Sequence, residues 1–72
     1  MRVFSGPRLK AARLAAGKSR EELSIDVGKS HPTIVSYETG RATPGADTLA
    51  KLADATHVDP GELFDVVDKA AA

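Results

Sequence analysis

Two copies of the tripeptide Gly-Lys-Ser, beginning at Gly17 and Gly28, are the part of this sequence that comes nearest to a phosphate-binding motif. A nucleotide-binding phosphate loop needs another glycine five residues before the glycine of Gly-Lys-Ser. Ala12 and Leu23 occupy those two positions, which excludes a nucleotide loop. In each copy the glycine can instead end one helix while the serine caps the next. The amides at the start of such helices can point at phosphates.

Catalytic and metal-binding chemistry finds little support in the residue types. The two histidines, His31 and His57, are separated by 26 positions, and the chain contains no cysteine. Most serines stand at predicted helix caps, and the aspartates stand at helix starts and on solvent faces. No nucleophile and base are held by a third group, and a chain this short leaves little room for a closed pocket. We therefore expect no enzyme, no metal site and no cofactor.

Length and composition predict one small domain outside the membrane. The chain has 72 residues, which sets one domain as the ceiling. The absence of cysteine excludes disulfides and thiolate metal sites. No apolar run approaches the roughly 20 residues of a membrane-spanning helix, and the first residues lack the apolar stretch of a signal peptide. We expect a cytoplasmic protein.

The formal net charge of zero conceals a strong asymmetry along the chain. Residues 1–43 contain eight Lys or Arg and four Asp or Glu, a net charge of +4. Residues 44–72 contain two basic and six acidic residues, a net charge of −4. Such a chain could meet an anion with its N-terminal part. Two differently solvated surfaces would give the same distribution, so charge alone leaves both interpretations open.

Glycine, serine and proline positions divide the chain into five predicted helices. No segment alternates with a period of two for long enough to predict a strand. The apolar residues at helical spacing that should form the core include Leu9, Leu23, Val27, Ile34, Leu49, Leu52, Ala53 and Leu63. We expect residues 1–5 to be an N-terminal arm, 6–68 the domain, and 69–72 a frayed tail. The predicted helices run from Pro7 to Ala16, Arg20 to Val27, His31 to Thr39, Ala46 to Thr56, and from Asp59 through Leu63 and Phe64.

Two short helices joined by a tight turn, between Ser19 and Thr39, have the form of a helix-turn-helix. Ser19 and Glu22 have the spacing of a capping box, which marks the start of the first of the two. In a DNA-binding helix-turn-helix the second helix enters the major groove. An ordinary helical hairpin in a bundle has the same local pattern, so the helices alone leave both functions open.

A wider set of residues, within the stretch from Gly6 to Phe64, favours DNA binding by resemblance. It comprises Leu9, Arg13, Gly17, Ser19-Arg20-Glu21-Glu22-Leu23, Val27-Gly28-Lys29-Ser30, Thr33-Ile34-Val35-Ser36-Tyr37-Glu38-Thr39-Gly40-Arg41, Pro44, Leu49, Leu52-Ala53, Val58 and Glu62-Leu63-Phe64. In these residues the chain resembles the lambda-repressor-like helix-turn-helix family, also called the Xre or Cro family. The resemblance implies an all-α, compact five-helix domain that binds double-stranded DNA.

The resemblance also assigns roles to individual positions. The helix 31–39 should read the DNA. The positions that match base contacts are Ser30, His31, Pro32, Thr33 and Ser36. Those that match phosphate contacts are Arg20, Arg41 and Thr43, and Arg13 and Glu38 match a structural ion pair. Lys29 departs from the family pattern, and we assign it to a phosphate contact because it is basic and precedes the helix.

Some residues depart from the pattern expected of base readers. The sequence contains no Asn and no Gln, the side chains that pair with adenine through two hydrogen bonds. His31 can bond guanine and the hydroxyls can bond many bases, but none discriminates strongly. Lys29 stands where an apolar residue is common, and Val35 stands where a small polar residue is common.

We interpret the chain as a sequence-specific transcriptional regulator that pairs weakly with a second copy through its C-terminal part. Phe64, Val66 and Val67 would supply that contact. The alternative is a protein-interaction module of the same fold, such as an antitoxin subunit, coactivator or adaptor, with a protein partner. The sequence does not name an operator, a regulated gene or an effector, nor does it separate activation from repression.

Overall fold

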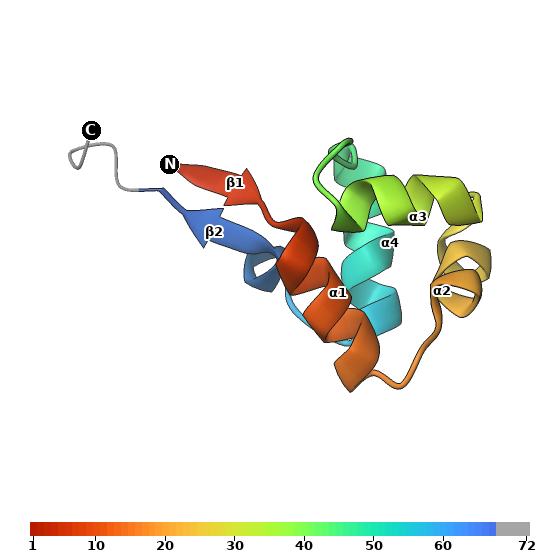
Figure 1. Cartoon of the computed structure of the whole chain (residues 1–72). Helices are drawn as coiled ribbons and strands as arrows, with labels where there is room; N and C mark the ends of the chain where they lie inside the picture. The colour runs from red at the N-terminus through yellow and green to blue at the C-terminus, as the bar shows by residue number, and fades with distance from the viewer. Residues whose placement is uncertain (68–72) are drawn as a thin grey trace.

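The computed structural model describes residues 1–67, which form four α-helices, one short 3-10 helix and a two-stranded antiparallel sheet (Figure 1). The compact helical fold predicted from the sequence is confirmed, with four α-helices in the described part rather than five. In chain order the elements are β1 (Arg2–Phe4), α1 (Gly6–Ala15), α2 (Arg20–Val27), α3 (His31–Glu38), α4 (Ala46–Thr56), the 3-10 helix η1 (Pro60–Leu63) and β2 (Phe64–Val66).

Side-chain caps and a left-handed glycine determine how α2 leads into α3. The Ser19 hydroxyl accepts a hydrogen bond from the Glu22 amide at 3.1 Å, and the Glu22 carboxylate accepts one from the Ser19 amide at 2.9 Å. Gly28 ends α2 with a φ of 69°, a conformation in which a Cβ atom would be strained. Ser30 caps α3 by accepting from the Thr33 amide at 3.3 Å. The bounds of α2 and α4 are those predicted from the sequence.

The core lies where α1 and α2 each pack against α3 and α4. Five of its side chains have almost no exposed surface: Leu9, Leu23, Ile34, Leu52 and Leu63. In Figure 1, α4 lies behind α3 and between α1 and α2, while the sheet projects from the end of the molecule opposite α2. The buried apolar side chains of this core come from all four α-helices and η1, and α3 packs on both α1 and α2.

The predicted continuation of a fifth helix past Leu63 is wrong. The capped start is present as η1, where the Asp59 amide donates to the Glu62 carboxylate at 2.8 Å. From Phe64 the chain extends and pairs antiparallel with β1, and the Phe4 and Phe64 rings meet edge to face at 6.3 Å. Aromatic and β-branched residues favour strands, and β1 supplies the hydrogen-bond partners that a strand at this position needs.

The strands also change the description of the chain ends. Arg2–Phe4, within the expected N-terminal arm, is strand β1, and the Met1 carbonyl accepts from the Val67 amide at 2.7 Å. Each strand has only three residues, too few to produce a visible alternation in the sequence. The frayed tail expected at 69–72 lies outside the described residues.

At Gly6 the start of α1 lies close against the backbone at the end of α3. A Cβ atom at Gly6 would clash with the Glu38 carbonyl oxygen and would lie 2.5 Å from that of Tyr37. Both neighbours are backbone atoms, which cannot turn aside as a flexible side chain can. Glycine is therefore required here for the contact between α1 and α3.

We predict that Gly6→Ala lowers the free energy of unfolding by about 2 kcal/mol or more, because α1 must move away from α3. Gly61→Ala is the matched control, since its Cβ would meet only the Arg2 side chain at 3.7 Å. Urea denaturation of the two variants measures the difference. Equal stability of the two variants would contradict the close approach at Gly6.

Candidate nucleic-acid interface

The first turn of α3 presents short polar side chains to solvent. Ser30, His31 and Pro32 are exposed, and Thr33 and Ser36 are partly buried. The Ser30 and Thr33 hydroxyls lie 2.8 Å apart and both belong to the helix cap. The His31 ring and the Ser36 hydroxyl make no side-chain hydrogen bond within residues 1–67. These two side chains are therefore free to bond to an external partner without breaking the cap.

Basic and hydroxyl side chains lie before and after α3. Lys29 precedes the helix, and Arg41 and Thr43 follow it, all exposed. The turn after α3 is held by the Ser36 carbonyl, which accepts from the Arg41 amide at 2.9 Å and the Ala42 amide at 3.2 Å. The structure thus brings three of the four predicted phosphate contacts to the two ends of α3.

Arg20, the fourth predicted phosphate contact, lies in a different setting. Its Nε atom donates to the Glu38 carboxylate at 3.0 Å, and 34% of its side chain is exposed. Arg20 starts α2, whereas Glu38 ends α3. The contact between Arg20 and Glu38 was not predicted from the sequence. The only sequence signal for it is that a basic residue stands at the start of the second helix.

Glu38 is the centre of a buried ion cluster. Its side chain is 1% exposed, and it accepts from Arg13 through Nε at 2.7 Å and through Nη2 at 3.3 Å. The remaining Arg13 nitrogen, Nη1, donates to the Lys18 carbonyl at 2.9 Å. With Arg20 included, one carboxylate joins α1, α2 and α3. The structure therefore brings the predicted pair of Arg13 and Glu38 together and adds a third member.

Two effects oppose each other in setting the pKa of Glu38. Burial raises the pKa of the carboxyl group, because it disfavours the charged form. The hydrogen bonds and positive charges of Arg13 and Arg20 lower it, and together they outweigh burial. The pKa of Glu38 consequently lies below its ordinary value, and the carboxylate stays ionised at neutral pH.

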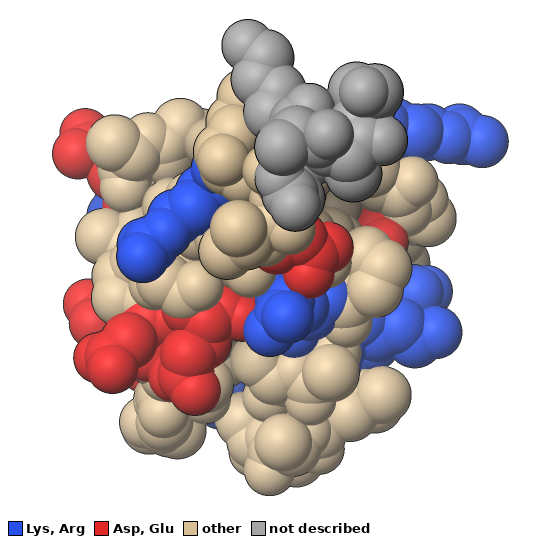
Figure 2. Space-filling model, turned by 90° about the vertical axis from the view of Figure 1, so that its left-hand side faces the viewer, with Lys and Arg blue, Asp and Glu red and all other residues tan. Residues whose placement is uncertain are grey.

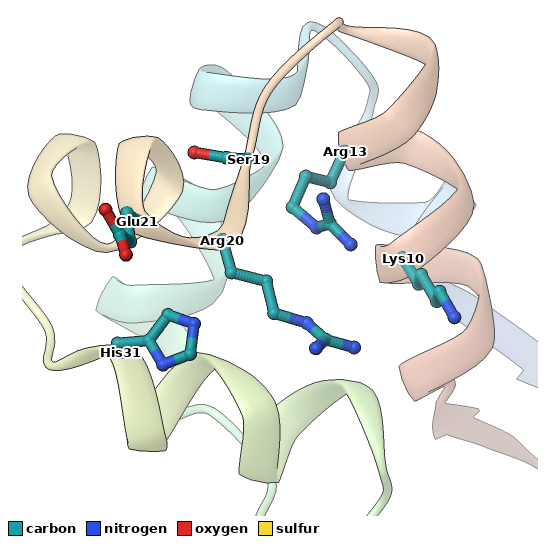
Figure 3. Close-up of a pocket in the computed structure, with 6 residues that line it drawn as sticks. All are labelled: Lys10, Arg13, Ser19, Arg20, Glu21 and His31. Atoms are coloured by element: carbon teal, nitrogen blue, oxygen red, sulfur yellow. The ribbon is translucent and has the colours of Figure 1, made fainter.

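An open depression of about 600 Å³ lies beside this cluster (Figure 3). Lys10 and Arg13 of α1 line it, with Ser19, Arg20 and Glu21 at the start of α2 and His31 at the start of α3. Figure 3 shows Arg20 extending from α2 across the face of α3 towards the side on which Lys10 lies. The depression suits contact with an extended anionic surface better than enclosure of a small substrate. Lys10 was missed in the sequence, although its place three residues before Arg13 puts the two on one helix face.

Both kinds of charged side chain lie on the face that carries the sheet. Figure 2 shows a group of acidic side chains at the lower left of this face, with basic side chains above it and to its right. Arg8 and Asp65 form an exposed ion pair at 2.5 Å, and the Arg8 hydrogen bond holds the pKa of Asp65 below its ordinary value. This pair links α1 to β2.

Residues 1–67 contain neither a candidate metal site nor a candidate membrane-spanning helix. No group of three His, Asp or Glu side chains comes together in a way that could hold a metal ion. No helix of the described chain is long and apolar enough to cross a membrane.

Residues 9–63 match the family profile described as helix-turn-helix. The chain belongs to this family. Comparison with solved structures agrees with the lambda-repressor-like type predicted from the sequence. The restriction-modification controller protein C.AhdI from Aeromonas hydrophila is 34% identical, with a TM-score of 0.77 over 82% of this chain and 89% of that one.

Two further structures resemble this helix-turn-helix protein. The P22 c2 repressor, solved in complex with a synthetic operator, is 26% identical with a TM-score of 0.78, over 85% of this chain and 92% of that one. A protein from Bacteroides fragilis is 28% identical with a TM-score of 0.78, over 90% of this chain and all of that one. A search of curated protein sequences gave no match.

We predict that Glu38→Gln destabilises this helix-turn-helix protein far more than Glu21→Gln. Glutamine offers one acceptor oxygen to three arginine N–H donors and leaves the Arg13 charge buried without a counter-charge. Breaking a buried ion pair costs about 3 kcal/mol, which should lower the Tm by more than about 10 °C in a domain of this size. Glu21 is exposed and makes no ion pair within residues 1–67. Equally small shifts in thermal unfolding would contradict the account.

We predict that the difference in stability between the native protein and Glu38→Gln depends on pH. Because the pKa of Glu38 is lower in the folded than in the unfolded state, its contribution to stability is fully present above the unfolded pKa. It is lost as the pH falls through the folded pKa, in the range below about pH 4. The Tm difference between the native protein and Glu38→Gln should therefore narrow below about pH 4.

Proposed function

We propose that this protein is a DNA-binding transcriptional regulator that inserts α3 into the major groove of duplex DNA. The observation that carries the proposal is the exposed first turn of α3, with Lys29 before the helix and Arg41 after it, on a helix-turn-helix held rigid by caps and core packing. Its similarity to a restriction-modification controller and to a repressor solved on its operator supports the same function. An α-helix fits the width of the major groove, and polar side chains at its N-terminal end can reach the base edges.

His31 and Ser36 are the side chains that best suit contact with base edges. His31 is exposed at the first position of α3, and Ser36 lies on the same helix with a free hydroxyl. Ser30 and Thr33 would reach bases with hydroxyl groups that already serve the cap, and Pro32 contributes shape without a donor. This set predicts modest discrimination between bases.

Lys29, Arg41 and Thr43 would contact phosphates beside the groove, and Arg20 would contact one nearer to α2. Phosphate contacts orient the protein but carry no sequence information. They make affinity fall steeply with salt, whereas base contacts set preference among sequences. The two kinds of contact are therefore separable by experiment.

We predict that Arg41→Ala weakens binding to preferred and random duplexes by similar factors and reduces the salt slope by about one. His31→Ala should cost about 1–3 kcal/mol on the preferred site and little on random DNA. Fluorescence anisotropy at several salt concentrations measures both effects, and each variant controls for loss of fold in the other. If neither change alters DNA affinity in folded protein, the protein-interaction alternative becomes the better interpretation.

We propose further that two copies bind a symmetric site by pairing through the C-terminal part. Val66 and Val67 are exposed there, 77% and 41% respectively, whereas Phe64 packs on Phe4. Pairing would place two α3 helices about 34 Å apart, one turn of DNA. Sedimentation should show weak self-association that tightens on palindromic DNA and is weakened by Val66→Lys. A complex of one protein per symmetric duplex at high protein concentration would rule this pairing out.

A further inference from the structure

We propose that Glu38 is a positioning residue for DNA contact: it holds the Arg20 guanidinium so that the two Nη groups face a backbone phosphate. This inference rests on the proposed function and adds a role to a side chain that touches no DNA itself. Its basis is the hydrogen bond from Arg20 Nε to the Glu38 carboxylate, which joins the start of α2 to the end of α3.

The geometry of the guanidinium group lets the bond to Glu38 limit its orientation. The group is planar and carries its five N–H donors in a rigid fork. With Cδ tethered by the side chain and Nε bonded to Glu38, the two Nη groups can take only a narrow range of directions. Within residues 1–67 these Nη groups make no hydrogen bond, and about a third of the Arg20 side chain, 34%, stays exposed. A second acceptor can therefore bind Arg20 while the first bond is kept.

Glu38 can perform this role because it is itself held in place. Two hydrogen bonds from Arg13 fix the carboxylate, and the side chain is 1% exposed. Two arginines and one carboxylate leave the cluster with a charge of +1, so it still attracts a phosphate. Lys10 and His31 border the depression beside Arg20 (Figure 3), and Lys10 adds positive charge on the side towards which Arg20 extends.

The alternative is that Glu38 and a DNA phosphate compete for Arg20. A phosphate would then pull Arg20 away from Glu38, and the carboxylate would weaken DNA binding. The two relations predict opposite signs for the removal of the Glu38 charge: positioning predicts weaker binding and competition predicts tighter binding. The sign of the effect therefore decides between them.

Arg20→Lys tests the bridging geometry without disturbing the bond between Arg13 and Glu38. Lysine keeps the charge but has one nitrogen, which cannot take the place of both Nε and the Nη pair. We expect Arg20→Lys to bind a random duplex about fivefold more weakly. The control Arg8→Lys, at the exposed pair with Asp65, should bind as the native protein does. Native affinity in Arg20→Lys would overturn the proposal.

A double-mutant cycle separates positioning from a purely structural role. Glu38→Gln should weaken DNA binding about fivefold when Arg20 is present and have no effect on affinity when it is combined with Arg20→Ala. Tighter binding of Glu38→Gln, or equal weakening in both backgrounds, would overturn the proposal. If Glu38→Gln does not fold, the Arg20→Lys and Arg8→Lys pair decides alone.

A failure of the proposed function itself has a different signature. In that case the native protein would show no salt-dependent affinity for duplex DNA, whatever residue stands at position 20. The positioning role would then be overturned together with the function. Native DNA binding combined with an unaffected Arg20→Lys would overturn the positioning role alone.

Discussion

The position of α3 depends on one buried carboxylate. Glu38 lies at the end of this helix with its side chain 1% exposed, and a charge in that setting is tolerated only when its hydrogen bonds are complete. Arg13 and Arg20 complete them, so that α1 and α2 are both joined to α3. Gly6 lets the start of α1 lie against the carbonyl groups of the same turn. Ion pairing and backbone contact thus act at one place and fix the helix that we propose reads DNA.

This arrangement leaves the opposite end of α3 exposed, where we propose that the helix contacts DNA. The structural contacts gather at Glu38, whereas the first turn, from Ser30 to Thr33, is exposed or partly exposed and is held by its own cap. A helix with one buried and one exposed end can present its exposed end to a groove. The side chains it presents are small, which suits orientation by phosphates together with modest discrimination by His31 and Ser36.

Local signals in the sequence predicted most of this fold, and long-range contacts account for the rest. The serine caps and the glycine at position 28 predicted the bounds of α2 correctly because they act within one or two turns. Strand β2 was missed because its partner, β1, lies at the other end of the described chain. The contact of Arg20 with Glu38 was missed for the same reason: a basic residue at a helix start shows that a charge is present, but not which acidic residue it meets.

The central claim is that the start of α3 meets duplex DNA, and a titration of random-sequence duplex into ¹⁵N-labelled protein tests it most directly. The amide signals of Ser30, His31, Thr33 and residues 41–43 should shift, and added salt should reverse these shifts. The signals of β1 and β2 should not respond to the DNA at low protein concentration. Shifts confined to β1 and β2, or no shifts at all, would contradict the account.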